Sequence, residues 1–390
     1  MSKILFIVSN PLEINTSASI RNKAMIEGLL LNGHTVDLVT TAPNPQHIAY
    51  DESLAVQGIH VTQISMNSRQ KLSGMGGKNR LFLRLKSFVY KWITSHTVYD
   101  PLKGFASHTD RVNLSKGGYD YIISSSDPKS SHLFALRLLE QQHGDFRGKW
   151  IQIWGDPFLT DITQISRKRN IIKAEEQRLL QAADFVFYVS KPTLKQQMQL
   201  YPECAHKMNY TPIPYLCEKI TENQRLDKTG KTKLAYCGDY SPSIRNLFPL
   251  YDAVNSANGF LELSICGGSS SPLQSTSSVH VMNRVPYCET RKIEDESDIL
   301  VFVANRSGTQ IPGKVYQYAG TNKPILFILD GDAALLKAQF SQYERFVFVG
   351  NSRADILNGI ESIVHSEKTY SPLKEFAKDY VMSEFMRKIS

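Results

Sequence analysis

Short apolar runs alternate with helical patterns from the third residue of this sequence onward, and this alternation restricts the possible folds most strongly. The first apolar run covers 4–8, a helical pattern follows over 19–32, and a second apolar run covers 35–40. Gly33 stands between them, where a helix C-cap belongs. A strand, a helix and a strand in this order predict an α/β protein with a parallel, doubly wound sheet.

The alternation continues to the end of the chain, with one polar interruption. In the first half we expect strands over 121–124, 150–153 and 185–189 and helices over 130–142 and 168–183. In the second half we expect strands over 234–237, 261–266, 279–282, 299–303, 325–329 and 346–349 and helices over 244–256 and 314–319. The segment 217–232 is polar and lacks periodicity, which is typical of a connection between domains.

The length of 390 residues is also typical of two domains. We therefore predict a Rossmann-like domain over 1–216, a linker over 217–232 and a second Rossmann-like domain over 233–370. We expect the last segment, 371–390, to form a helix that crosses back to the first domain.

Composition excludes several classes of protein. The five cysteines are scattered and form no C-x-x-C pair, which argues against a zinc site or a disulfide framework and favours reduced, cytosolic thiols. No run of eighteen apolar residues is present, and the N-terminal MSKILFIVSNP has the pattern of a first strand rather than of a signal peptide. We expect a cytoplasmic protein.

The net charge of +8 is concentrated in one segment. Between Ser53 and Tyr99 there is no acidic residue, whereas seven Lys and Arg side chains occur over 69–91. Apolar residues recur there at steps of three and four from Phe82 to Trp92, which predicts a basic amphipathic helix. Such a helix over 69–92 suits an anionic membrane surface, and the alternative is a helix that packs on its own domain while its cations are solvated.

The usual nucleotide-binding fingerprints are absent from the sequence. The first strand is followed by Ser9-Asn10-Pro11-Leu12 rather than G-x-G-x-x-G, and no Walker A sequence occurs. Dehydrogenase and phosphate-loop ATPase functions are therefore disfavoured. The basic residues also match no nucleic-acid recognition motif, so a nucleic-acid partner is disfavoured as well.

Two loops of the second half suit a phosphate group. One, 238–246, follows a predicted strand and contains Gly238 and Arg245, which we expect in the first turns of the next helix. The other, 304–312, also follows a strand and leads to a helix that begins at Lys314. Backbone N–H groups at a helix start, together with a cation, favour binding of a diphosphate. A solvated first-turn lysine is the alternative for Lys314.

Six segments together resemble a known family of enzymes. They are GHTVDLVT (33–40), SSSDPKSSH (124–132), KWIQIWGDPF (149–158), ADFVFYVS (183–190), LAYCGDYSPSIRN (234–246) and IPGKVYQYAGTNKPIL (311–326). The last is similar to the pattern IPSKIFEYLAAGKPIL and is the most specific. The chain thus resembles the GT-B-fold retaining glycosyltransferases, closest to the glycosyltransferase family 4 type of bacterial surface-polysaccharide synthesis.

The resemblance implies two Rossmann-like doubly wound domains that face a central cleft, with a nucleotide diphosphate sugar held mainly by the second domain. It implies that Arg245 and Lys314 bind the donor diphosphate and that Gly238 lets the backbone approach it. Further donor contacts are implied for Arg284, Val285, Thr309, Gln310, Ile311, Pro312, Gly313 and Gln317. Such enzymes need no metal ion, and we expect no metal and no cofactor beyond the donor substrate.

The sequence departs from the family pattern in two places. Many members carry two glutamates where this chain has Thr309 and Gln317, although a glutamine still offers hydrogen bonds to a ribose. The glycine pair of the family's first loop is replaced by Ser17-Ala18-Ser19. The resemblance places a cleft loop at Asn15, Thr16 and Ser17.

Two aspartates in loops after strands are the candidate catalytic residues. Asp156 in WGDPF matches an aspartate of the family, and Asp127 occupies another such loop before Pro128. A carboxylate there can orient or deprotonate an acceptor hydroxyl, and the alternative is that Asp156 caps the turn at Pro157.

The resemblance implies transfer of a sugar, with retention of configuration, to a hydroxyl of a glycan or of a lipid-linked acceptor. We expect such an enzyme to dock on the inner face of the plasma membrane. The alternatives are a nucleotide-sugar epimerase of the same fold and a catalytically silent subunit that binds sugar nucleotides.

Overall fold

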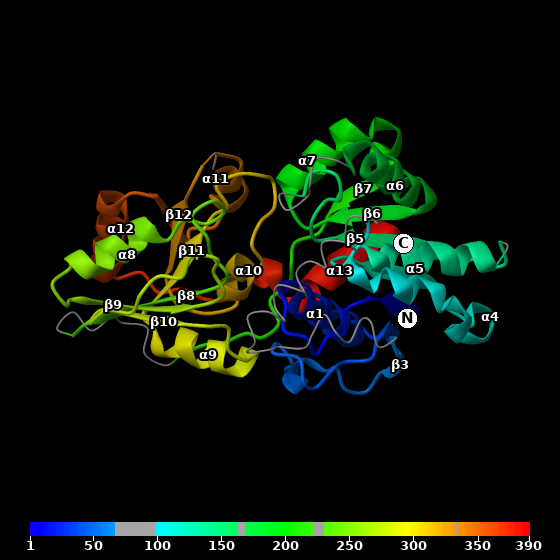
Figure 1. Ribbon diagram of the computed structural model, residues 1–390, viewed down its shortest axis with the longest axis horizontal. Helices are drawn as coiled ribbons and strands as arrows, with labels where there is room; N and C mark the ends of the chain where they lie inside the picture. The colour runs from blue at the N-terminus through cyan, green and yellow to red at the C-terminus, as the bar shows by residue number, and fades with distance from the viewer. Residues whose placement is uncertain (67–97, 143, 162–167, 222–229, 332–333) are drawn as a thin grey trace, which may run out of the picture. The chain divides into compact units, whose positions relative to one another are not determined.

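Figure 1 shows the computed structural model, which describes residues 1–66, 98–142, 144–161, 168–221, 230–331 and 334–390. The described residues fall into two units, one formed by Met1–Pro212 with Lys378–Ser390 and the other by Ile213–Ala377. Each unit has its own parallel sheet and its own hydrophobic core. The predicted α/β class, with two Rossmann-like doubly wound domains, is confirmed.

The sheet of the first unit has seven strands in the order β3-β2-β1-β4-β5-β6-β7, and all neighbours are parallel. The strands are β1 (Lys3–Ile7), β2 (Thr35–Thr41), β3 (His60–Ile64), β4 (Tyr121–Ser125), β5 (Lys149–Trp154), β6 (Phe185–Tyr188) and β7 (Met208–Tyr210). The strand order reverses between β1 and β4. Ligands of open α/β sheets bind beyond the carboxyl ends of the strands at such a switch point.

The helices of the first unit cover both faces of this sheet. They are α1 (Ser17–Leu31), α4 (Leu114–Gly117), α5 (Ser130–Gln141), α6 (Arg169–Ala182), α7 (Lys191–Leu200) and α13 (Lys378–Ile389). Strands covered on both faces consist of nearly continuous apolar residues, which explains runs such as ILFI in β1. Trp150 and Trp154 of β5 are the largest fully buried side chains of this core.

The last helix of the chain, α13, packs against α1 near the N-terminus (Figure 1). Lys378 Nζ lies 2.5 Å from Glu27 Oε2, and the side-chain amide of Asn32 donates to the carbonyl oxygen of Asp379 over 2.8 Å. These contacts fix the end of the chain to the first unit.

The sheet of the second unit has six strands in the order β10-β9-β8-β11-β12-β13, again all parallel. The strands are β8 (Thr232–Cys237), β9 (Leu261–Cys266), β10 (Val279–Met282), β11 (Ile299–Val303), β12 (Ile325–Leu329) and β13 (Phe346–Gly350). The helices are α8 (Phe248–Ser256), α9 (Tyr287–Glu296), α10 (Lys314–Ala319), α11 (Ala334–Phe340) and α12 (Arg353–His365). The switch point lies between β8 and β11.

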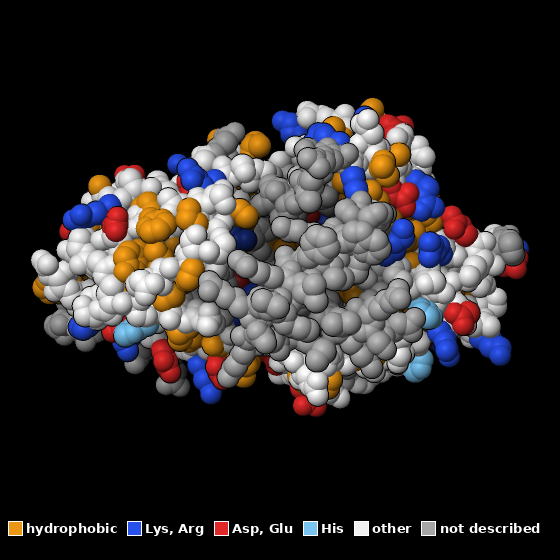
Figure 2. Space-filling model, in the orientation of Figure 1, with side chains coloured by type: hydrophobic (Ala, Val, Ile, Leu, Met, Phe, Trp, Pro, Cys, Tyr) orange, Lys and Arg blue, Asp and Glu red, His pale blue; other side chains and the backbone are white. Residues whose placement is uncertain are grey.

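Figure 1 shows α8 and α12 side by side on one face of this sheet, and α9 on the opposite face. The core beneath α8 and α12 consists mainly of Leu, Ile and Val side chains. A second group of rings, Phe327 of β12, Phe340 of α11 and Phe346 of β13, packs edge to face and at tilted angles. On the visible surface of both units, acidic and basic side chains are interspersed (Figure 2).

The boundaries differ from the expected ones at two places. The chain passes from the first unit to the second at Pro212/Ile213, and it returns at Ala377/Lys378. The start of the predicted linker belongs to the second unit because Lys219 pairs with Thr321, and Thr221 is bonded to Asn322. None of the helices within the described ranges has the length and apolar character needed to cross a membrane.

Candidate functional site

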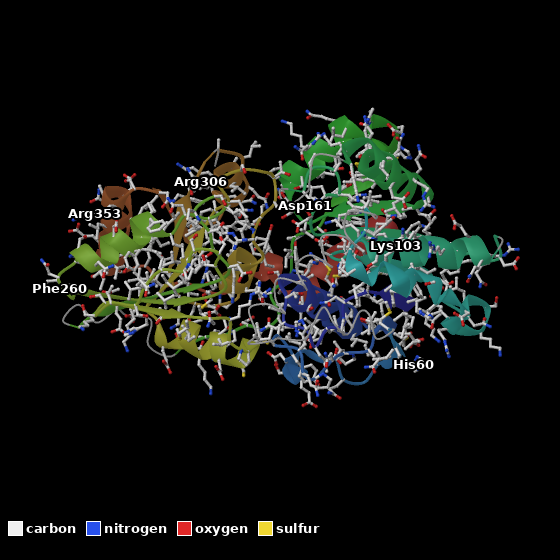
Figure 3. The ribbon with its side chains drawn as sticks, viewed as in Figure 1. His60, Lys103, Asp161, Phe260, Arg306 and Arg353 are labelled. Carbon is white, nitrogen blue, oxygen red and sulfur yellow. The ribbon has the colours of Figure 1, made fainter. Side chains whose placement is uncertain are left out.

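The two loops expected to suit a phosphate flank the switch point of the second sheet. The loop 238–247 follows β8, and the loop 304–313 follows β11, the neighbouring strand. Arg306 N–H donates to the carbonyl oxygen of Ile244 over 2.8 Å, so the loops are hydrogen-bonded to each other (Figure 3 labels Arg306). Sequence elements sixty residues apart therefore form one surface, at the place where such sheets bind ligands.

Arg245 belongs to this surface but does not lie on a helix, contrary to the expectation from sequence. Helix α8 begins at Phe248, because the carbonyl oxygen of Ile244 bonds to Arg306 and the N–H of Phe248 bonds to the side chain of Asn246. A tight turn closed by Arg245 N–H and Ser241 O, at 2.9 Å, precedes the helix instead.

The guanidinium of Arg245 is held by neutral oxygen atoms. Its Nε donates to Asn305 Oδ1 over 2.9 Å, and its Nη1 donates to the carbonyl oxygen of Asp239 over 2.7 Å. Asn305 in turn donates to the carbonyl oxygen of Gln310 over 3.2 Å. Because neither partner of Arg245 is charged, the positive charge of this side chain is oriented by its neighbours without being neutralised.

Arg284 has a carboxylate partner in the same region. Its Nε donates to Asp239 Oδ1 over 2.8 Å, and this oxygen also accepts the N–H of Gly268 at 2.8 Å. Partial burial by itself raises the pKa of Asp239, but the bonds to Arg284 outweigh it and the net pKa is lowered. Val285 follows in the loop between β10 and α9.

Lys314 begins α10, as predicted, and its ammonium group contacts a buried carboxylate rather than bulk solvent alone. Lys314 Nζ lies 2.6 Å from Glu294 Oε1, and Arg291 Nη1 lies 3.0 Å from Glu294 Oε2. The side chain of Glu294 is 1% exposed, whereas that of Lys314 is 22% exposed. Two cations share one carboxylate here, so one positive charge remains unbalanced.

The loop that leads to α10 packs closely onto the second unit. Gln310 and Ile311 are buried, and the carbonyl oxygens of Pro312 and Gly313 accept the first N–H groups of α10. Gln310 Oε1 is buried and has no hydrogen-bond partner within the described ranges. Thr309 lies in the same loop and is partly buried.

Gln317, the residue expected to contact a ribose, is bonded at both ends of its amide. Its Nε2 donates to the carbonyl oxygen of Pro214 over 3.2 Å, and its Oε1 accepts the N–H of Leu216 at 3.0 Å. The side chain thus ties α10 to the segment that enters the second unit. One hydrogen on Nε2 and one lone pair on Oε1 remain for another partner.

Gly238 lies where two strand ends approach each other closely. Its N–H donates to the carbonyl oxygen of Cys266 over 2.8 Å, and a Cβ atom on Gly267 would lie 2.0 Å from the carbonyl oxygen of Gly238. The absence of a side chain at Gly267 therefore permits the close packing of the loops after β8 and β9, whereas a Cβ atom on Gly238 would make only ordinary contacts, the nearest at 3.5 Å from Tyr236 Oη.

In the first unit, Asp127 and Asp156 follow the neighbouring strands β4 and β5. The ammonium group of Lys129 contacts Asp127, and it lies 3.2 Å from Asp161 Oδ2 (Figure 3 labels Asp161). Burial alone lowers the pKa of Lys129, but the carboxylates of Asp127 and Asp161 outweigh it and raise the pKa. This lysine stays protonated.

Asp156 has the most altered acidity of this group. Loss of solvation raises its pKa to about 7, and Asp127 adds to the rise, whereas Lys129 opposes it. No backbone N–H within the described ranges donates to this carboxyl group, so the alternative role of capping the turn at Pro157 has no supporting bond. A carboxyl group that titrates near neutral pH can accept and release a proton under physiological conditions.

Arg21 of α1 approaches the same group of side chains from a distant part of the sequence. Its guanidinium donates to the carbonyl oxygen of Ser126 and, over 3.4 Å, to Ser125 Oγ. A Cβ atom on Gly155 would lie 2.2 Å from Arg21 Nη1, so the glycine before Asp156 leaves room for the guanidinium. Arg21 Nε is buried and has no hydrogen-bond partner in the described part of the chain.

The predicted cleft loop, Asn15 to Ser17, leads into α1. Thr16 caps this helix, because its Oγ1 accepts the N–H of Ser19 at 3.1 Å. Asn15 N–H donates to the carbonyl oxygen of Ala49 over 2.7 Å. The loop therefore shapes the start of the helix that carries Arg21.

Several residues of both groups were not predicted. They are Arg21, Lys129 and Asp161 in the first unit and Asp239, Arg291, Glu294 and Asn305 in the second. Three of them lie in segments that the sequence singled out: Lys129 in SSSDPKSSH, Asp239 beside Gly238 and Asn305 in the loop 304–312. The predicted basic helix over 69–92 lies outside the described residues.

No protein-family model matches the sequence, and a search of curated proteins finds no significant match. Solved structures do match along the whole chain. The S. aureus MnaA-UDP co-structure has a TM-score of 0.55 at 11% identity and covers 100% of this chain and 96% of its own. The UDP-GlcNAc 2-epimerase from Neisseria meningitidis bound to UDP-GlcNAc has a TM-score of 0.53 at 12% identity, with 99% of each chain covered.

A glycosyltransferase from Rickettsia africae also matches, with a TM-score of 0.53 at 10% identity over 99% of this chain and 92% of that one. At identities this low, a structural likeness establishes the fold and not the reaction. These likenesses and the two parallel sheets identify the fold of this chain as GT-B, with two Rossmann-like domains.

Proposed function

We propose that this chain is an enzyme that acts on a nucleotide diphosphate sugar, and specifically a retaining glycosyltransferase of the family 4 type. The observation that carries this proposal is the group of cations at the switch point of the second sheet. This group has four cations and two carboxylates, which leaves two unbalanced positive charges. The cations are Arg245, Arg284, Arg291 and Lys314, and the carboxylates are Asp239 and Glu294.

An excess of two positive charges suits a diphosphate. Arg245 is the best-placed ligand, because its guanidinium is oriented by Asn305 and by the carbonyl oxygen of Asp239, which are both neutral. Lys314 contributes as a partly exposed cation whose carboxylate partner is shared with Arg291. Oriented donors that need no rearrangement stabilise charge that develops on a leaving phosphate.

The first unit supplies the acid-base group of the proposed reaction. Transfer to a hydroxyl requires removal of its proton, and Asp156, whose pKa is raised to about 7, is suited to this task. Asp127, in contact with Lys129, follows the neighbouring strand. We propose a glycan or a lipid-linked molecule as the acceptor, in bacterial cell-surface polysaccharide synthesis.

The cellular setting is part of the same proposal. The segment 69–92 contains no acidic residue, and its cations favour peripheral attachment to an anionic membrane from the cytoplasmic side. No nucleic-acid partner is proposed.

A nucleotide-sugar epimerase is the second candidate, and the adjacency of Asp127 and Asp156 favours it. A pair of neighbouring carboxyl groups, of which Asp156 has a pKa raised to about 7, can remove and return a proton at a carbon atom as well as at a hydroxyl. Two of the similar structures described above were solved with UDP or with UDP-GlcNAc. An epimerase needs no acceptor, which separates the two functions. The third candidate, a silent subunit, binds the nucleotide without turnover.

The test is incubation of the purified protein with a panel of radiolabelled UDP sugars, with and without a lipid extract as acceptor. A transferase releases UDP and yields a labelled product only when the acceptor is present. An epimerase changes the sugar without acceptor and releases no UDP from the completed cycle. Asp156→Asn serves as the inactive control. Binding without conversion of any sugar, with or without acceptor, would contradict both enzymatic functions.

A further inference from the structure

Lys129 occupies the centre of three carboxylates that come from two different loops. Its ammonium group contacts Asp127 of its own loop and lies 3.2 Å from Asp161 Oδ2, beyond β5. Lys129 itself is 8% exposed, and it directly precedes the first turn of α5. A buried ammonium held at this point cannot swing into solvent without losing its contacts with both carboxylates, which is strongly unfavourable.

The charged groups that face Asp156 come from one helix and two loops. Arg21 approaches from α1, Asp127 and Lys129 from the loop before α5, and Asp161 from the loop after β5. Two more titratable groups lie beside Lys129, on α5 and α6, and each already has hydrogen-bond partners.

His132 of α5 is bonded to Ser124 Oγ at 2.8 Å, and burial keeps its pKa far below the ordinary value, so it is uncharged. Glu176 of α6 accepts the N–H groups of Phe158 and Leu159 and the hydroxyl of Tyr201. Since these two groups are engaged elsewhere, the charges that act on Asp156 within the described ranges are those of Asp127, Asp161, Lys129 and Arg21.

We propose that Lys129 is a positioning residue: its ammonium group holds Asp127 and Asp161, and Asp156, which it does not contact, is left as the group of this cluster that exchanges a proton. The use of that proton rests on the proposed function, whereas the charge arrangement does not depend on the substrate. Lys129 touches no reacting atom. It acts on the reaction through the position and the charge of its neighbours.

The electrostatic effects agree with this assignment. Lys129 lowers the pKa of Asp156 while Asp127 and Asp161 raise it, with loss of solvation as the largest cause of the rise. Asp156 lacks the direct ammonium contact that Asp127 and Asp161 both have. The carboxyl group without that contact is therefore the one that retains its proton up to near-neutral pH.

Substitutions in the cluster have predictable and opposite effects. Lys129→Met removes a cation and should raise the pKa of Asp156 by about 1 or more, because an opposite charge within a few ångströms shifts a carboxyl group by about 1 to 3. Asp161→Asn removes an anion and should lower it. Lys129→Arg keeps the charge and should leave the pKa within about 0.5 of the wild-type value.

The experiment is a pH titration of the whole protein labelled with carbon-13 at the aspartate carboxyl group and followed by NMR. Asp156→Asn and Asp127→Asn assign the signals. Lys116→Met and Asp110→Asn are matched controls, because both side chains are exposed and lie outside the cluster. The rate of sugar transfer is measured against pH in parallel. In each variant, the pH at which the rate falls on the acid side should shift in the same direction as the NMR midpoint.

We expect a titration midpoint near neutral pH that is absent in Asp156→Asn. Lys129→Met should raise this midpoint and Asp161→Asn should lower it. The two control variants should leave it unchanged. A midpoint that belongs to Asp127, or that Lys129→Met leaves unchanged or lowers, would overturn the proposal. If Lys129→Met fails to fold, the test rests on Asp161→Asn. A titration midpoint of Asp156 that is raised or unchanged in that variant is sufficient to contradict the proposal. The predicted NMR shifts in a protein without turnover would support the role of Lys129 and contradict the proposed function.

Discussion

Lys314→Met removes the ammonium group that contacts the buried carboxylate of Glu294, and we expect it to weaken both the fold and the binding of a nucleoside diphosphate. Removal of one partner of a buried ion pair costs about 3 to 5 kcal/mol when the remaining charge is left uncompensated. Glu294 keeps its contact with Arg291 Nη1 at 3.0 Å, so only one charge-assisted bond is lost. We therefore expect the free energy of unfolding to fall by about 1.5 to 3 kcal/mol.

A second substitution separates the two effects. Glu294→Gln added to Lys314→Met removes the negative charge that lost one of its two partners. We expect it to restore part of the stability, because the glutamine oxygen can still accept a hydrogen bond from Arg291. It does not restore the missing cation, so the affinity for UDP should stay roughly 10- to 100-fold below wild type. Lys337→Met is the matched control, because Lys337 is an exposed lysine of the same unit.

Urea unfolding and calorimetric titration with UDP measure the two quantities on the same preparations. The reasoning is refuted if Lys314→Met is as stable as the wild type, because Glu294 would then not depend on Lys314. It is refuted equally if the double variant regains full affinity for UDP, since Lys314 would then act only by supporting the fold.

Three further outcomes are expected. Asp156→Asn should lower the transfer rate about a hundredfold or more with donor affinity near normal, as a kinetic comparison at saturating donor will reveal. Burial and Asp127 raise the pKa of Asp156 from 3.8 to about 7, so the folded state binds this proton more tightly than the unfolded state does. The free energy of unfolding should therefore fall as pH rises from 3.8 to about 7. In Asp156→Asn, thermal unfolding at several pH values should show a smaller decrease in stability over this range. The wild-type protein should sediment with anionic but not with neutral vesicles. The triple variant Arg80→Glu, Arg84→Glu and Lys86→Glu should sediment less with the anionic vesicles. Equal sedimentation of the wild type and the triple variant would exclude attachment through this segment.

Most strands were predictable because strands covered on both faces consist of apolar residues. The runs 261–266 and 299–303 coincide with β9 and β11. The edge strand β3 was missed because only Ile64 of its five residues is buried, so no apolar run marks it. Helix α9 was missed because it is rich in charged residues and buries polar side chains, Arg291 and Glu294 among them.

The position of a candidate residue was predictable only where the residue follows a predicted strand. Asp127, Asp156 and Gly238 do lie in loops after strands, as expected, because loops after parallel strands gather at one edge of the sheet. Their roles stay predictions. Arg21 lies on a helix more than a hundred residues before the loop that it contacts, and no local pattern predicts such a contact. The expected helical position of Arg245 was wrong because a hydrogen bond from Arg306, distant in the sequence, takes the carbonyl group that the helix needs.

The most direct test of the central claim is calorimetric titration of UDP into the wild-type protein, into Arg245→Ala and into the surface control Arg353→Ala, labelled in Figure 3. If the loops after β8 and β11 hold a diphosphate, the wild type and Arg353→Ala bind one UDP with the same affinity. Arg245→Ala should bind it at least about tenfold more weakly, because it loses an oriented charge-assisted bond. Equal affinity in Arg245→Ala, or no binding by the wild type at millimolar UDP, would contradict the claim.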